Sequence, residues 1–224
     1  MMIKLSVVLL IFTSTTTAAV WPEGQYCLPM PLNEQCPLGW ERGYRVHSTE
    51  GNDTIRGEVP YVKRHAHRSL EWGFCCKTRV SYYRSNLKWP QGRYCVFRKG
   101  GFCPQEFIEG SIHWDDRDAQ NTNRFVGTLP DGVYNQNTQI YFCCRIDGSR
   151  MLTGLPQCYS MILMRFGTCP TVDGYLGPHK GYIDWNTEDL FNNDQSSQGY
   201  PDGFSRFKSG IKIEFCSYTS SYSC

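Results

Sequence analysis

Two short acidic segments, each headed by a tryptophan, carry the side chains best suited to chemistry. They cover residues 114–118 (WDDRD) and residues 185–189 (WNTED). An aromatic ring can stack on the apolar face of a sugar, while carboxylates accept hydrogen bonds from its hydroxyl groups. The same oxygen atoms could hold calcium, although the spacing of an EF-hand is absent. A structural interpretation, with turns fixed by Asp and Asn and tryptophans in the core, is the third alternative. The candidate ligand-binding residues are Trp114, Asp115, Asp116, Asp118, Trp185, Glu188 and Asp189.

Paired carboxylates also invite comparison with glycosidases, which need an acid and a nucleophile or base. Asp115 and Asp116 alternate faces if extended, so the pair does not preset the separation that this mechanism requires. The chain contains no Gly-x-Ser-x-Gly and no His-Glu-x-x-His motif. His65 and His67 would share one side of a strand, but basic neighbours repel a metal cation. We therefore expect no enzymatic activity, no bound metal and no cofactor.

The amino terminus is typical of a signal peptide over residues 1–19. Lys4 precedes an apolar run at residues 5–12, and small and hydroxyl residues follow up to Ala19. A membrane anchor would need about 20 apolar residues, so we expect no membrane span. Removal of Lys4 leaves 23 − 1 = 22 Lys and Arg against 21 Asp and Glu, a balance that does not point to nucleic acid. The expected product is secreted and extracellular, with residues 20–224 as a single domain.

Two motifs recur at the same offset, which indicates internal duplication. Residues 21–27 (WPEGQYC) return at 89–95 (WPQGRYC), and residues 74–77 (FCCK) return at 142–145 (FCCR), both after 68 residues (89 − 21 and 142 − 74). A more diverged third copy follows, and the two acidic segments occupy matching parts of copies two and three. Copy one lacks that tryptophan and carries His47 in the neighbourhood. The repeat units are approximately residues 21–88, 89–150 and 151–224.

The local sequence pattern predicts β-strands. Residues 93–98, 138–146 and 211–218 are short runs rich in aromatic and β-branched residues, bounded by turns such as residues 130–132 (PDG). No window predicts an amphipathic helix of three turns. We expect an all-β, disulfide-rich compact domain built from three tandem repeats with pseudo-threefold symmetry. Three separate small modules are the alternative.

All 12 cysteines lie beyond the signal peptide, and an even number in an exported chain predicts disulfides. Cys27 and Cys76 are separated by the same 49 residues as Cys95 and Cys144 (76 − 27 and 144 − 95). In copy three, Ser217 stands where the second cysteine of the pair is expected. The predicted bridges are Cys36–Cys75, Cys103–Cys143 and Cys169–Cys216 as one set, Cys27–Cys76 and Cys95–Cys144 as a second, and Cys158–Cys224 from the two that remain.

Together these motifs resemble the C-terminal domain of apextrin, the ApeC domain. The likeness rests on the Trp-Pro-x-Gly-x-Tyr runs, the Phe-Cys-Cys strands, the segment at 110–123, and the runs at 129–134 (LPDGVY) and 143–148 (CCRIDG). It extends from residue 21 to about residue 218. The resemblance implies a secreted protein of innate defence and extracellular adhesion that binds bacterial peptidoglycan or its muramyl-peptide fragments and can agglutinate bacteria.

We therefore expect a non-enzymatic pattern-recognition protein whose partner is bacterial cell-wall glycan or another extracellular polysaccharide. Three equivalent loops would let weak sites sum to avidity, with copies two and three dominating. The alternative is a structural or adhesive protein of an extracellular matrix or coat. An oligomer is compatible with either function. Asn52 begins the sequon at residues 52–54 (NDT), so we expect it to be glycosylated.

Overall fold

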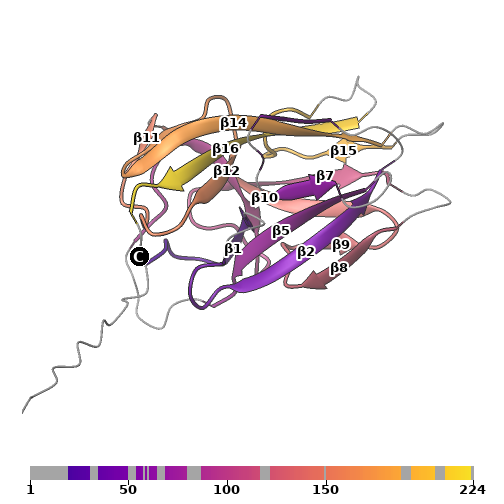
Figure 1. Ribbon diagram of the computed structural model, residues 1–224, viewed down its shortest axis with the longest axis horizontal. Helices are drawn as coiled ribbons and strands as arrows, with labels where there is room; N and C mark the ends of the chain where they lie inside the picture. Colours follow the sequence, from indigo (N-terminus) through magenta and orange to yellow (C-terminus); the bar gives the residue numbers. More distant parts are fainter. Residues whose placement is uncertain are drawn as a thin grey trace, which may run out of the picture.

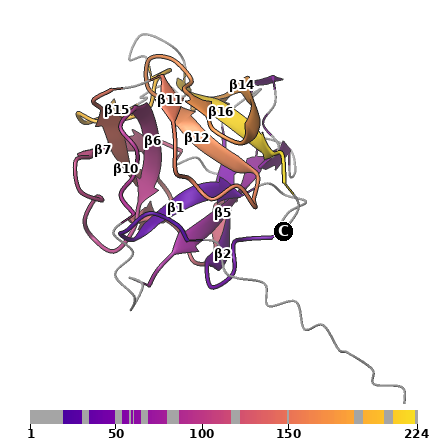
Figure 2. The ribbon, with the colours of Figure 1, turned by 90° about the vertical axis from the view of Figure 1, so that its left-hand side faces the viewer.

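The computed structural model is built from β-strands (Figures 1 and 2). Within the described part of the chain no helix occurs, and none is therefore long and apolar enough to cross a membrane. The all-β prediction is confirmed. The predicted signal peptide and the predicted glycosylation site, Asn52, lie outside the described residues. The structure describes residues 20–30, 35–49, 54–57, 59, 61–64, 69–79, 87–116, 122–148, 150–187, 193–204 and 210–222.

Fourteen of the strands form one curled sheet, and the parallel pair β11 and β13 stands apart from it. Figure 1 shows β14 and β16 on one side of the molecule and β2 and β8 on the other. The strands are β1 (Tyr26–Met30), β2 (Glu41–Ser48), β3 (Thr54–Gly57), β4 (Val62–Arg64), β5 (Ser69–Lys77), β6 (Arg93–Arg98), β7 (Ile108–Trp114), β8 (Arg124–Gly127), β9 (Gly132–Tyr134), β10 (Thr138–Ile146), β11 (Met151–Leu152), β12 (Met161–Arg165), β13 (Thr171–Val172), β14 (Tyr175–Asn186), β15 (Gln195–Ser196) and β16 (Gly210–Ser220).

The same antiparallel pairing occurs once in each repeat. β5 pairs with β1 and β2, β10 with β6 and β7, and β16 with β12 and β14. The first strands of the three groups, β1, β6 and β12, lie side by side (Figure 2). Threefold symmetry between the copies stays a prediction. In each group a phenylalanine beside the cysteine faces a glycine on the outer strand: Phe74 and Gly43, Phe142 and Gly110, Phe215 and Gly181.

A short additional strand from each copy pairs with the outer strand of another copy. β8 of copy two pairs with β2, β15 of copy three pairs with β7, and β3 of copy one pairs with β14. The glycines allow this close approach, because a β-carbon at Gly43 would lie 2.0 Å from the carbonyl oxygen of Thr128. At Gly110 it would lie 1.9 Å from that of Gln198. The three copies are therefore interleaved in one sheet.

The aromatic residues of the Trp-Pro-x-Gly-x-Tyr motif belong to the second of two core clusters. The hydroxyl of Tyr26 donates to the carbonyl of Pro22 at 3.0 Å, and the hydroxyl of Tyr94 donates to that of Pro90 at 2.6 Å. Both tyrosines are fully buried, so each phenol needs such a partner. The motif recurs because it fixes how the chain enters the first strand of a copy.

The predicted disulfides are confirmed wherever the structure describes both cysteines. Neighbouring cysteines such as Cys75 and Cys76 point to opposite sides of β5, so they serve different partners. Cys158 is also disulfide-bonded, while its predicted partner Cys224 lies outside the described residues. The described bridges are Cys27–Cys76, Cys36–Cys75, Cys95–Cys144, Cys103–Cys143 and Cys169–Cys216.

Copy three offers a direct test of the equivalence of the repeats. Ile162 faces Ser217 across β12 and β16, at the place where Cys95 faces Cys144 in copy two with a Cα separation of 4.0 Å. We expect the double substitution Ile162→Cys/Ser217→Cys to close a further disulfide. The bridge should raise the free energy of unfolding by about 2–4 kcal/mol, less the loss of the isoleucine packing. Mass spectrometry without reduction and urea unfolding measure both effects. Two free thiols in the folded variant would contradict the equivalence.

Candidate binding site

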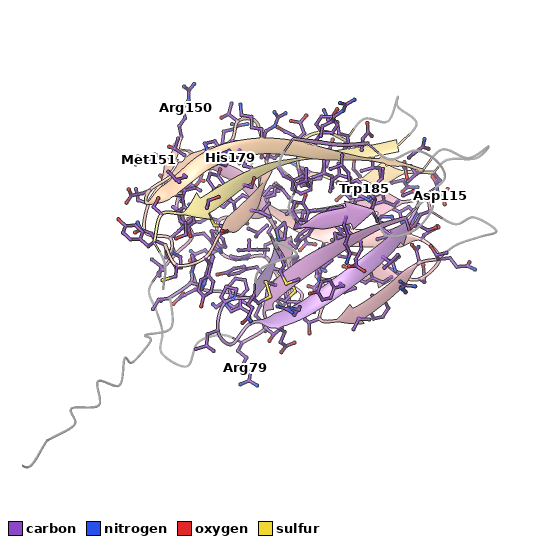
Figure 3. All side chains as sticks on the ribbon, viewed as in Figure 1. Arg79, Asp115, Arg150, Met151, His179 and Trp185 are labelled. Atoms are coloured by element: carbon purple, nitrogen blue, oxygen red, sulfur yellow. A yellow bond between two sulfur atoms is a disulfide. The ribbon has the colours of Figure 1, made fainter. Side chains whose placement is uncertain are left out.

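The two tryptophans at the heads of the acidic segments lie in the core. Trp114 and Trp185 are both 0% exposed, and their ring centroids are 5.7 Å apart. Trp72 and His47 complete the cluster, with centroids 5.1 Å from Trp185 and 5.4 Å from Trp114 respectively. Figure 3 shows Trp185 among the strands and Asp115 at one end of the molecule. Neither indole offers a face to a sugar ring, so the positions of the tryptophans favour the structural interpretation.

Asp116 belongs to a buried polar network that ties the first acidic segment to β2. Its Oδ2 lies 3.0 Å from His47 Nε2 and accepts hydrogen bonds from Asn123 Nδ2 at 2.7 Å and Thr138 Oγ1 at 2.9 Å. Arg45 Nη2 lies 3.9 Å away. Burial opposes ionisation, but His47 and the hydrogen bonds from His47, Asn123 and Thr138 hold the pKa of Asp116 below its ordinary value. A carboxylate that is only 1% exposed stabilises the fold and is not accessible to a polymeric ligand.

Asp115 connects the two acidic segments. Its backbone N–H donates to Asp194 Oδ1 at 2.9 Å, and its Oδ2 accepts from the backbone N–H of Asn193 at 3.0 Å. Thr187 Oγ1 donates to the other oxygen of Asp194 at 2.5 Å. The structure thus brings the described parts of both segments together. The remaining predicted residues, Asp118, Glu188 and Asp189, lie outside the described residues.

A polar pocket of about 390 Å³ lies beside this junction. Its volume falls within the range of small-molecule sites, about 300–1,000 Å³. Every lining side chain among the described residues is polar. In the part of the chain that the structure describes, no group of three His, Cys, Asp or Glu side chains could hold a metal ion. The lining residues are Ser111, His113, Gln139, Asn193, Gln195, Ser196 and Ser197.

Strand alternation explains how a core strand lines this pocket. On β7, Trp114 points into the core, so Ser111 and His113 lie on the opposite face. His113 pairs with Gln139 of β10 on one side and with Gln195 of β15 on the other. An imidazole therefore lies between two carboxamides drawn from copies two and three. Sequence reasoning selected Trp114 and missed His113, which is one residue earlier.

Hydrogen bonds within the pocket hold its side chains in place. Ser197 Oγ accepts from the backbone N–H of Ser111 at 2.7 Å and lies 3.2 Å from Ser111 Oγ. Gln139 Nε2 donates to Ser111 Oγ at 3.4 Å. Gln195 Nε2 donates to Asn193 Oδ1 at 2.8 Å. A site ordered before its ligand arrives loses less conformational entropy on binding.

The corresponding surfaces of copies one and three have different chemistry. Their positions follow from the shared register of the phenylalanine and glycine pairs. These positions include Glu71, which forms an ion pair with Lys63 at 2.7 Å, and Lys212, which forms one with Glu214 at 2.9 Å. Among the described residues, the neutral polar surface thus lies where β7 and β10 of copy two meet β15 of copy three. The residues that correspond to Ser111 and Gln139 are Tyr44 and Glu71 in copy one and Tyr182 and Lys212 in copy three.

The family model for the C-terminal domain of apextrin matches residues 21–218. The chain belongs to the ApeC family. The match includes both tryptophan-headed segments, the polar pocket and all five described bridges, and it confirms the resemblance identified from the sequence motifs. No curated protein and no solved structure matches the chain. ApeC membership and the disulfide frame are consistent with an extracellular, apextrin-like protein.

Proposed function

We propose that this ApeC chain is a secreted recognition protein of innate defence that binds bacterial cell-wall glycan, either peptidoglycan or its muramyl-peptide fragments. The observation that carries the proposal is the polar pocket on β7, β10 and β15. Sugars present many neutral hydroxyl and amide groups at fixed angles. Serine, asparagine, glutamine and neutral histidine can both donate and accept hydrogen bonds, so they match such a ligand.

Binding without catalysis agrees with the placement of the described carboxylates. A glycosidase needs a carboxylic acid and a second carboxylate on either side of the scissile bond. Asp116 is buried within its network, and Asp115 accepts a hydrogen bond from the Asn193 backbone. Among the described residues, the pocket lining contains no Asp or Glu. We therefore assign the site to recognition.

We also propose that the three copies are related by pseudo-threefold symmetry. The support is the repeated register of three strands in each copy and the exchange of β3, β8 and β15 between copies. The sequence led us to expect several equivalent loops acting together, but the neutral pocket lies where copies two and three meet. Agglutination of bacteria would therefore require an oligomer or a second contact on the same chain.

Replacing the central histidine of the pocket tests the proposed function. His113→Ala should weaken binding to insoluble peptidoglycan by about tenfold, because the pocket loses a hydrogen-bonding ring at its centre. Co-sedimentation with purified peptidoglycan measures the effect. His179→Ala is a matched control, since His179 is also a partly exposed strand histidine but lies outside the pocket.

Equal binding by His113→Ala and the parent protein would overturn the proposed site. Release of reducing sugars during the incubation would overturn the non-enzymatic assignment. A parent protein that binds neither peptidoglycan nor muramyl fragments and is recovered in an insoluble coat would favour the structural or adhesive alternative.

A further inference from the structure

A second hollow adjoins the polar pocket. It is an open groove of about 740 Å³, bounded by β8, β9, β10 and the turn after β6. Unlike the pocket, it includes apolar and aromatic side chains. Those that matter here are Phe125, Val133, Tyr134 and Tyr141.

The groove and the pocket share a boundary. Gln139 lines the pocket and Tyr141 lines the groove, and the two lie on the same face of β10 because they are two residues apart. Val133 of β9 lines the groove and pairs directly with Gln139. Gln139 of the pocket therefore has Tyr141 of the groove next to it on β10 and Val133 of the groove opposite it on β9.

The groove offers exposed aromatic surface. Phe125 is 54% exposed, and its ring centroid lies 6.1 Å from that of Tyr134. Val133 is 45% exposed on the side nearer the pocket. Clustered exposed apolar side chains beside polar ones are typical of a binding surface. The exposed ring of Phe125 suits the C–H face of a sugar, while the pocket supplies the hydrogen bonds. Arg45 and Arg98 already stack on the rings of Tyr134 and Tyr141, at 5.5 and 3.9 Å from the ring centroids.

The charged side chains that border the groove already form ion pairs or hydrogen bonds within the protein. Arg98 forms ion pairs with Asp131 at 3.1 Å and with Glu109 at 2.7 Å. Lys99 Nζ donates to the carbonyl of Leu129 at 2.7 Å. Pairing reduces the field that these charges exert on an incoming ligand. The ion pairs of Arg98 therefore leave the groove without a strong preference for a ligand of either charge.

We infer that the pocket and the groove are two parts of one elongated site, which takes a linear glycan chain with further sugar units lying on the aromatic groove. The inference rests on the proposed function and specifies its ligand, a chain of several sugars in place of a single terminal unit. The groove makes affinity depend on chain length.

Glycan strands freed of peptide and fractionated by length test this inference. Calorimetric titration of the parent protein should show affinity rising by about tenfold from disaccharide to octasaccharide as the aromatic contacts are added. Phe125→Ala should bind the disaccharide like the parent but lose most of the increase. Val133→Ser should act in the same direction. Leu176→Ala removes an apolar side chain that is 61% exposed outside the groove, so it should behave like the parent.

The outcomes separate this inference from the proposed function. If the parent binds disaccharide and octasaccharide equally, or if Phe125→Ala keeps the full increase, the elongated site is wrong while the pocket stands. If no strand of any length binds, the proposed function and the inference both fail. If a sugar-free stem peptide competes with the octasaccharide but not with the disaccharide, the groove takes peptide and the inference is overturned.

Discussion

Trp114→Ala should lower the free energy of unfolding by about 3–5 kcal/mol. The indole is 0% exposed and packs against Trp72, Trp185 and His47, so its removal leaves a cavity lined by rigid rings. In a close-packed core, the neighbouring side chains cannot move far enough to fill the space that the indole leaves. Urea unfolding followed by tryptophan fluorescence and by circular dichroism measures the loss.

The next residue towards the amino terminus provides the control. His113 lies on the opposite face of β7, so His113→Ala should change the free energy of unfolding by no more than about 0.5 kcal/mol while weakening glycan binding. Trp114→Phe keeps an aromatic ring in the core and should bind peptidoglycan like the parent. A folded Trp114→Phe variant that no longer binds would show that the indole contacts ligand.

Removing the buried carboxylate of copy two should have an effect of similar size. Asp116→Ala leaves Arg45 and His47 in the interior without their acidic partner, which should cost about 3–5 kcal/mol of unfolding free energy. Burial already lowers the pKa of Arg45, a shift that Asp116 opposes. Asp173→Ala, at an exposed aspartate, should change stability by no more than about 0.5 kcal/mol. An equally small change for Asp116→Ala would contradict the network.

The same network predicts a dependence on acid. The pKa of Asp116 in the folded protein lies below its ordinary value of 3.8, so the unfolded chain takes up the proton first as pH falls. The stabilisation by Asp116 is therefore complete above about pH 5 and is lost as pH falls through the folded pKa. The stability difference between the parent and Asp116→Asn should narrow over that range. A difference that stays constant into strong acid would contradict the assignment.

The covalent frame followed from the sequence for physical reasons. Two cysteines in succession on a strand must face opposite ways, and this alternation together with the duplicated spacing defined partners for Cys75 and Cys76. The paired Trp-Pro and Tyr residues recur because each tyrosine hydroxyl needs a buried acceptor. Local rules of this kind are visible in a single copy and are strengthened by repetition.

The proposed binding surface depends on contacts that a local pattern does not reveal. Trp114 could face either side of β7, and its direction is decided by Trp72 and Trp185, which are distant in the sequence. The pocket also needs β15, a strand of two polar residues that arrives from copy three. Nothing in the pair Gln195 and Ser196 distinguishes it from a loop. The tryptophans and carboxylates were selected from the sequence for their chemistry, but the pocket is lined by the neutral polar residues beside them.

The position of the bound ligand tests the central claim most directly. Isotope-labelled, disulfide-intact protein can be titrated with muramyl dipeptide while the backbone and side-chain amide signals are followed by NMR. We expect the largest shifts at His113, Gln139 and Gln195, where β7, β10 and β15 line the pocket. Saturable shifts confined to the corresponding surfaces around Tyr44 and Tyr182, with the pocket signals unchanged, would contradict the account.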